Sequence, residues 1–169
     1  MSTSNNCTMC GSRMTKAQDS SFHYLDSGLS KVFLKGITVL RCTNKECGEE
    51  EIGIPNMVEL HQLIATKIAT STTKLIPEEI RFLRTHLGFS GTEFAKAFGV
   101  SAETTSRWEK GSVNMKEASE RLLRVLVLAK VGPFLNYEDL KVFATIAKKT
   151  PLKHVFKVER NNWTYGKAS

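Results

Sequence analysis

The stretch that decides the fold is residues 90–111, which read SGTEFAKAFGVSAETTSRWEKG. Its first part opens with Ser90 and a glutamate three residues later, the pattern of a helix capping box, and it closes at Gly99. Ser101 then offers a second N-cap, and Gly111 offers a second C-terminal stop. Two short helices joined by Gly-Val-Ser have the spacing of a helix–turn–helix.

The second of these helices carries a polar face that suits DNA. Thr105 and Trp108 are expected to pack on the preceding helix, which leaves Arg107 on the opposite side. In a helix–turn–helix this helix enters the major groove, where an arginine can hold guanine with about 1–3 kcal/mol of discrimination. Hydroxyls and free amides at helix starts suit phosphate oxygens. The predicted DNA-binding residues are Ser90, Thr92, Ser101, Ala102, Glu103, Ser106, Arg107 and Lys110.

Two short helices and a glycine turn are also compatible with a small helical bundle that binds nothing. The flanking sequence predicts further elements. Residues 21–41 alternate in the manner of strands, and residues 56–68 have helical spacing that begins at a potential N-cap, Asn56. A polar linker is predicted at 69–74. More helices are predicted at 77–88, 114–130 and 136–149.

Four cysteines form two pairs in the front half. Cys7 and Cys10 are spaced C-x2-C, Cys42 and Cys47 are spaced C-x4-C, and both pairs end in Cys-Gly. Four thiolates predict one closed, tetrahedral structural zinc site. The alternatives are disulfides and a redox C-x-x-C pair, but a redox pair is more typical of a thioredoxin-like βαβ pattern, which this sequence lacks. Metal binding would supply much of the folding energy of so small a strand-rich segment.

Length, composition and charge narrow the class of protein. The chain has 169 residues, 41% hydrophobic and 24% charged, which is typical of a globular protein. No apolar run approaches the roughly 18 residues of a membrane span, and the N-terminus lacks the features of a signal peptide. We therefore expect a cytoplasmic protein, where disulfides are rare. The net charge of +7 comes entirely from residues 73–169, which indicates an anionic partner for the back half.

Several segments resemble known families. Residues 80–111 resemble the Xre/Cro-type DNA-binding domain, above all in the final SRWEKG. From Cys7 to about Leu128 the chain resembles the MqsA/YgiT antitoxins, in the Cys-Gly knuckles, GEEEIGIP, LIPEEIRFLR and RLLRVL. This resemblance implies that the zinc domain covers a partner toxin that cuts RNA. It also implies that the helix–turn–helix pairs with a second copy, represses the operon, and reads bases with Glu103 and Arg107.

These observations together predict an α+β protein of two domains, a small zinc-bound β-ribbon followed by an all-α, lambda-repressor-like helix–turn–helix. The predicted divisions are a zinc ribbon at 1–54, a bridging helix and linker at 55–74, an Xre-type domain at 75–131, and a C-terminal helix and basic tail at 132–169. The predicted function is a DNA-binding regulator that is also the antitoxin of a type II toxin–antitoxin module. The alternative is a stand-alone zinc-ribbon regulator with no toxin.

The remaining features concern partners and activity. Specific repressors bind as two-fold pairs, so we expect a homodimer held by the helices at 115–129 and 136–149. No nucleophile, phosphate-loop or dinucleotide motif is present, and we expect no enzymatic activity. Residues 150–169 are either a loosely packed end, a basic arm along DNA, or a strand that engages a partner. The expected partners are double-stranded operator DNA, a second copy of the chain and a small toxin encoded by an adjacent gene. We expect no association with a membrane.

Overall fold

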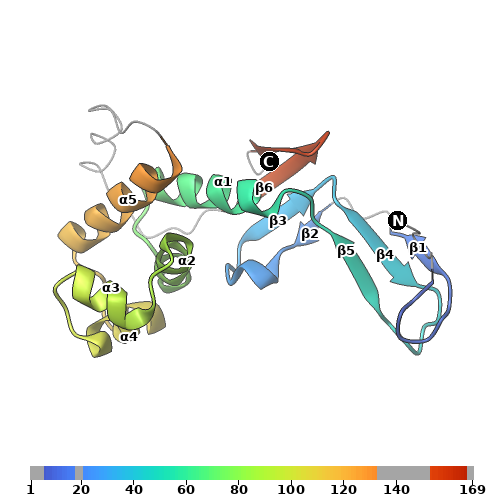
Figure 1. The fold of residues 1–169 in the computed structure, drawn as a ribbon, viewed down its shortest axis with the longest axis horizontal. Helices are drawn as coiled ribbons and strands as arrows, with labels where there is room; N and C mark the ends of the chain where they lie inside the picture. The colour runs from blue at the N-terminus through green and yellow to red at the C-terminus, as the bar shows by residue number, and fades with distance from the viewer. Residues whose placement is uncertain (1–5, 18–20, 133–152, 167–169) are drawn as a thin grey trace.

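The computed structural model describes residues 6–17, 21–132 and 153–166, and within these ranges the fold is α+β with five α-helices and two small sheets. Figure 1 shows an elongated molecule with the sheet of β1, β4 and β5 at one end, α2 to α5 at the other, and α1 beside the second sheet between them. The elements are β1 (Met14–Lys16), β2 (Phe22–His23), η1 (Leu25–Ser27), β3 (Val32–Lys35), β4 (Thr38–Cys42), β5 (Glu50–Gly53), α1 (Met57–Ala69), α2 (Pro77–Leu87), α3 (Gly91–Ala97), α4 (Ala102–Lys110), α5 (Glu117–Val131), β6 (His154–Glu159) and β7 (Asn162–Gly166).

The first sheet has the order β1-β4-β5 and is antiparallel throughout. Its buried side chains, Met14 and Val39, do not belong to the main hydrophobic core. This sheet therefore has little apolar burial of its own to stabilise it, as expected of a segment that relies on a metal.

The second sheet joins two distant parts of the chain in the order β2-β3-β6-β7. β3 and β6 are parallel, with Leu34 opposite Phe156, and both side chains are fully buried. β2 and β3 lie in the predicted zinc-ribbon segment, whereas β6 and β7 lie in the predicted tail, for which a loosely packed end, a basic arm and a strand were the alternatives. Residues 154–166 fold as a hairpin that completes a sheet, because alternate apolar side chains on β6 and β7 can be buried there.

Side chains of the hairpin contact residues from other parts of the chain. The Trp163 indole donates to the carbonyl of Pro55 (2.9 Å), and the Lys67 ammonium of α1 lies 4.9 Å from the centre of the Tyr165 ring. The two-residue turn of the hairpin, Arg160 and Asn161, has positive φ at both positions. This is the conformation that matches the twist of paired strands.

One continuous hydrophobic core connects the second sheet with the helices. It includes side chains from β3, α1, α2, α4 and α5, such as Leu34, Ile64, Leu83, Trp108 and Leu123. Both α2 and α5 pack against α1. The four-stranded sheet and the helical end are therefore joined by apolar packing as well as by α1 itself.

Each of the five described helices corresponds to a predicted one. They are α1 for 56–68, α2 for 77–88, α3 for 90–99, α4 for the helix that begins after Ser101, and α5 for 114–130. The helix predicted at 136–149 lies outside the described residues. Among the helices that are described, none has the length and apolar character needed to cross a bilayer.

The predicted polar linker between α1 and α2 is held in place by a buried arginine of α5. Arg124 is fully buried and pairs with Glu120 at 2.8 Å. The same Glu120 carboxylate accepts from the Leu75 amide at 3.1 Å. The Arg124 guanidinium donates to four backbone carbonyls, those of Ile68 (3.0 Å), Ala69 (3.0 Å), Ser71 (2.6 Å) and Thr73 (2.5 Å).

Candidate functional site

The four cysteines meet at the outer tip of the three-stranded sheet. Cys7 and Cys10 lie in the loop before β1, Cys42 ends β4, and Cys47 lies in the loop between β4 and β5. Their sulfur atoms all lie within 4.8 Å of one another. Two loops that are 31 residues apart in sequence are thus brought together by the pairing of β1 with β4.

Each cysteine loop turns back at its glycine. Gly11 has φ 71° and Gly48 has φ 65°, both in the left-handed region that other residues rarely adopt. The Gly11 amide donates to the carbonyl of Cys7 at 2.9 Å, and the Gly48 amide donates to the carbonyl of Asn44 at 3.3 Å. These turns are why Cys-Gly closes both pairs in the sequence.

The geometry of the thiols fits one tetrahedral metal ion. The Cys7 and Cys47 sulfurs are 3.7 Å apart, and those of Cys10 and Cys42 are 3.4 Å apart. A tetrahedral site with metal–sulfur bonds of about 2.3 Å places its sulfurs about 3.8 Å apart. All four cysteines are free, so the cluster can supply four thiol donors.

The electrostatics of the cluster differ from one thiol to the next. Hydrogen bonds with Ser12 lower the pKa of Cys10, whereas removal from water raises the pKa of Cys42. One thiol therefore ionises readily while a neighbour keeps its proton. A divalent cation would favour all four thiolates and release the remaining protons.

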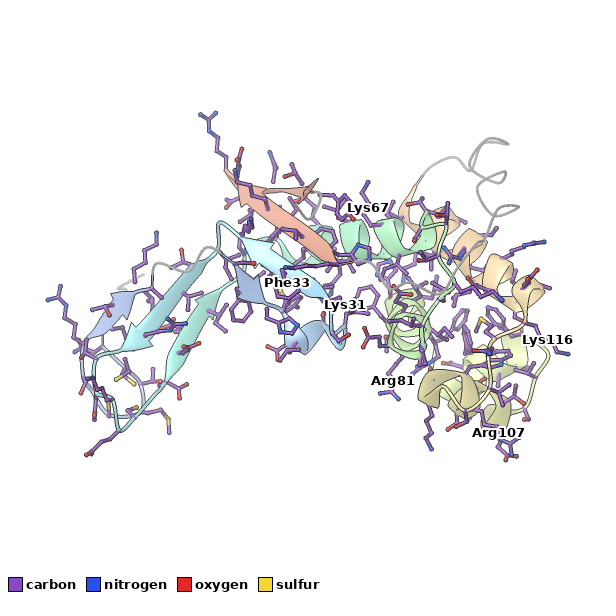
Figure 2. All side chains as sticks on the ribbon, turned by 180° about the vertical axis from the view of Figure 1, so that it is seen from behind. Lys31, Phe33, Lys67, Arg81, Arg107 and Lys116 are labelled. Atoms are coloured by element: carbon purple, nitrogen blue, oxygen red, sulfur yellow. The ribbon has the colours of Figure 1, made fainter. Side chains whose placement is uncertain are left out.

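A second candidate surface is the exposed side of α4. Thr105 and Trp108 are buried at 2% and 3% exposure, whereas Arg107 and Glu103 have 56% and 72% of their side chains exposed. Arg107 and Glu103 form an ion pair at 2.6 Å along this face. Figure 2 shows Arg107 at the far end of the helical half of the molecule. Ala102 and Lys110 are also exposed, and Ser106 is half-buried.

The residues predicted to contact phosphates at the helix starts are already used as caps. The Ser90 amide donates to the Glu93 carboxylate (2.8 Å), and the Glu93 amide donates to the Ser90 hydroxyl (3.2 Å). The Ser101 hydroxyl likewise accepts from the Thr104 amide at 3.1 Å. The Ser90 amide is therefore not the free donor that the sequence analysis assumed. Thr92 does not cap a helix; it is exposed, and its hydroxyl oxygen lies 3.2 Å from the hydroxyl oxygen of Ser90.

A family model described as the antitoxin component of a bacterial toxin–antitoxin system, MqsA, matches residues 5–131. The chain belongs to the MqsA antitoxin family. This match includes both the cysteine cluster and α4, and it ends before the β6–β7 hairpin. Comparisons with curated proteins and with solved structures gave no match.

In this member of the MqsA family, Glu109 orients α4, a role that the sequence analysis missed. Its carboxylate pairs with Arg84 at 2.5 Å and with Arg81 at 3.4 Å, both on α2. Arg84 also donates to the carbonyl of Phe89, which follows α2, at 2.7 Å. Sequence spacing carries no signal for this network, because the partners are about 25 residues apart on different helices. These ion pairs hold the Glu109 side of α4 against α2, so the opposite side of α4 faces outward.

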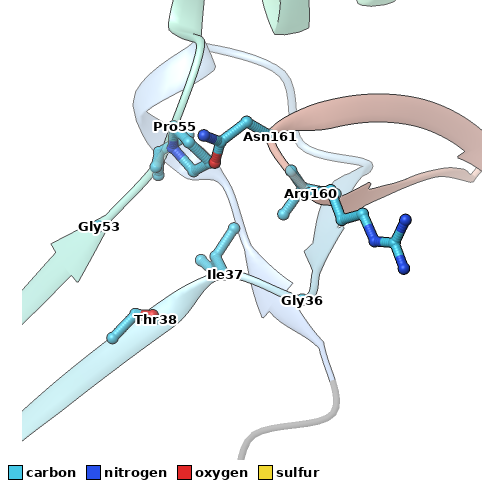
Figure 3. A pocket seen from close by; sticks show the side chains of 9 residues that line it. Gly36, Ile37, Thr38, Gly53, Pro55, Arg160 and Asn161 are labelled. Carbon is cyan, nitrogen blue, oxygen red and sulfur yellow. The ribbon is translucent and has the colours of Figure 1, made fainter.

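The MqsA-family chain also has an open pocket of about 460 Å³ where the two sheets meet. Figure 3 shows its walls, which include Gly36 and Ile37 between β3 and β4, Pro55, and the hairpin turn at Arg160 and Asn161. Among the described residues that line it, none is a cysteine, a histidine or a carboxylate.

Proposed function

We propose that this chain is the antitoxin and transcriptional repressor of a two-gene toxin–antitoxin module. In this proposal the cysteine-bearing segment 1–54 binds structural zinc and covers a toxin. Residues 75–131 act as an Xre-type helix–turn–helix on operator DNA, and 55–74 connect the two. Membership of the MqsA family supports the antitoxin role, and reduced thiols in the cytoplasm would keep the metal site intact.

The observation that carries the DNA-binding part is the exposed face of α4. α3 and α4 are two short capped helices joined by a tight turn, and the apolar side of α4 is buried. This leaves Ala102, Glu103, Ser106, Arg107 and Lys110 for base edges, with Ser90, Thr92 and Ser101 near phosphates. The Arg107 guanidinium donates to the Glu103 carboxylate, and guanine could accept two hydrogen bonds from the same guanidinium in its place.

A matched pair of arginine substitutions tests this assignment. Arg107→Ala is expected to weaken binding to the protein's own promoter by about tenfold or more, since one bidentate base contact contributes about 1–3 kcal/mol. Arg121→Ala is the control, because Arg121 is also an exposed arginine paired with a glutamate four residues earlier. Fluorescence anisotropy on a labelled promoter duplex measures both. Equal affinities for the two variants would contradict the assignment of α4.

The toxin-binding and zinc roles rest on the front half. Four thiols with the spacing of a tetrahedral site support structural zinc, with Cys7, Cys10, Cys42 and Cys47 as its ligands. Chelation is expected to release one zinc per chain and to abolish capture of the adjacent gene's product. If a chelated chain captured that product normally, the zinc segment would not be the toxin-binding part.

We also propose that the repressor is a homodimer in which α5 contributes to the interface. Leu122 of α5 is 42% exposed although it is apolar, which suits a second copy of the same helix. Two half-sites about one helical turn apart are then expected in the operator. Sedimentation of a monomer at tens of micromolar would contradict this arrangement.

A further inference from the structure

The four-stranded sheet has an outer face that the proposed operator contacts leave unused. On β3, Val32 and Leu34 point into the core, which places Phe33 and Lys35 on the other face. The register pairs Phe33 with Val155 and Lys35 with Lys157, so both strands contribute to this face. Of these side chains Val155 is buried and Phe33 is half-buried, whereas both lysines are exposed. Phe33 lies near the middle of the molecule, far from Arg107 (Figure 2).

An aromatic and basic cluster occupies the centre of this face. The His23 ring stacks on the Phe33 ring with centroids 4.5 Å apart and planes within 10°. The Lys153 ammonium lies 4.5 Å from the Phe33 centroid. His23 is exposed and lies on the edge strand β2, so its ring is accessible to a further planar group.

Most of the charged side chains on this face are basic. Lys35 and Lys157 are partners in the register of the parallel strands β3 and β6, so two positive charges lie on neighbouring strands. Among the described strand residues of this face, Glu159 is the one carboxylate, and it pairs with Lys157. Three lysines around an apolar and aromatic centre therefore favour an anionic ligand that also carries flat rings.

We propose that this outer face binds single-stranded RNA. Phosphates would lie against Lys35, Lys153 and Lys157, while an unpaired base stacks on the His23–Phe33 pair. Duplex DNA offers the phosphates but keeps the faces of its bases inside the helix, and an acidic peptide offers charge without rings. Unpaired nucleic acid in a cell is mostly RNA.

Half of this surface lies outside the family match. Lys153, Val155 and Lys157 come from residues beyond position 131, where the match to the MqsA family ends. The proposed face therefore combines β2 and β3, which lie within the family match, with a hairpin that lies outside it. His23, Phe33 and Lys35 belong to the segment 1–54 that is proposed to cover the toxin, whereas the proposed operator contacts lie around α4. The RNA proposal can therefore fail while the operator contacts stand.

The test is anisotropy of the full-length, zinc-loaded protein with a fluorescent single-stranded RNA 12-mer of mixed sequence. Phe33→Leu keeps an apolar side chain but removes the ring, and it is expected to weaken RNA binding at least about fivefold. Lys35→Gln with Lys157→Gln is expected to lower the slope of log K against log salt by roughly 1.4, since each phosphate contact on a single strand contributes about 0.7. Lys16→Gln with Lys45→Gln, two exposed lysines of the ribbon, is the control.

Promoter duplex, a DNA 12-mer of the same sequence and an acidic peptide are measured in parallel. The proposal expects RNA to bind at least as tightly as single-stranded DNA, and it expects duplex binding to be unchanged in both variants. RNA affinity that is the same in the two variants and in the control pair would overturn it. So would a loss of duplex binding equal to the loss of RNA binding, a preference for DNA, or displacement of RNA by the acidic peptide. Thermal melts of each variant show that the fold is retained.

Discussion

Replacing Arg124 by methionine tests how the helical end is held to the rest of the molecule. Arg124→Met keeps an unbranched side chain of similar reach but removes the guanidinium. Four carbonyls between positions 68 and 73 then lose the guanidinium donor, and the Glu120 carboxylate is left buried without its cation. Two of those carbonyls, Ile68 and Ala69, belong to the last turn of α1, and Ile68 still accepts from the Ser71 amide at 3.2 Å.

The expected effect is large. Removing one partner of a buried ion pair costs about 3–5 kcal/mol. For a chain of this length each kcal/mol lowers the melting temperature by about 2–4 °C, which gives a fall of roughly 6–20 °C. Arg121→Met is the matched control, one turn earlier on α5, where the arginine is 46% exposed and pairs with Glu117 at 3.5 Å. An exposed pair of this kind contributes at most about 1 kcal/mol.

Urea unfolding and thermal melts followed by circular dichroism measure both variants. Hydrogen exchange adds a local readout, because the amides of residues 70–75 are expected to lose protection first in Arg124→Met. The double variant Arg124→Met with Glu120→Met is expected to recover part of the loss, since it also removes the unpaired carboxylate. If Arg124→Met were no less stable than Arg121→Met, the account of a fixed connection between α1 and α2 would be wrong.

Three further perturbations test other parts of the structure. Gly36→Ala is expected to release the C-terminal hairpin, because Gly36 has φ 80° and an added Cβ would lie 2.5 Å from the Val158 carbonyl oxygen. Faster protease cleavage within residues 154–166 would show that the hairpin is released. Burial raises the pKa of Glu79 from 4.5 to about 7, so the free energy of unfolding falls as pH rises from about 4.5 through 7. Glu79→Gln should remove that fall, on the order of 3 kcal/mol, in melts from pH 4 to 8. Cys47→Ser should abolish metal retention and raise the hydrogen-exchange rates of the amides in β1, β4 and β5. The melting temperature of the main core should stay the same, because that core contains none of the buried side chains of these strands.

Local signals in the sequence predict the helices well. Capping residues and glycine stops mark α3 and α4 closely, because Ser90, Ser101 and Gly111 each make a contact within one helical turn. Asn56 marks the start of α1, but its side chain donates to Glu59 and to the carbonyl of Asn161 and does not cap the helix. The start of the helix depends on local sequence, whereas the contact with Asn161 depends on a hairpin about 100 residues away.

The long-range features were missed for a physical reason. The alternate positions of His154, Phe156 and Val158, and of Trp163 and Tyr165, are a strand signal within residues 150–169, for which a strand was one of three predicted alternatives. Its partner β3 is more than 100 residues earlier, and pairing at that distance leaves no periodic trace. The buried network of Arg124 and the contacts of Glu109 likewise join residues on different helices. The cysteine cluster was predictable because thiol spacing and the following glycines are local to each loop.

The measurement that tests the central claim most directly is co-expression with the neighbouring gene. The product of that gene is placed under one inducible promoter and this chain under another. The antitoxin account predicts that the neighbour alone arrests growth and that this chain restores growth. It also predicts a stoichiometric complex of the two chains on gel filtration with light scattering. A neighbour that is harmless alone, together with a free homodimer that shifts its own promoter, would contradict the antitoxin account and favour a stand-alone repressor.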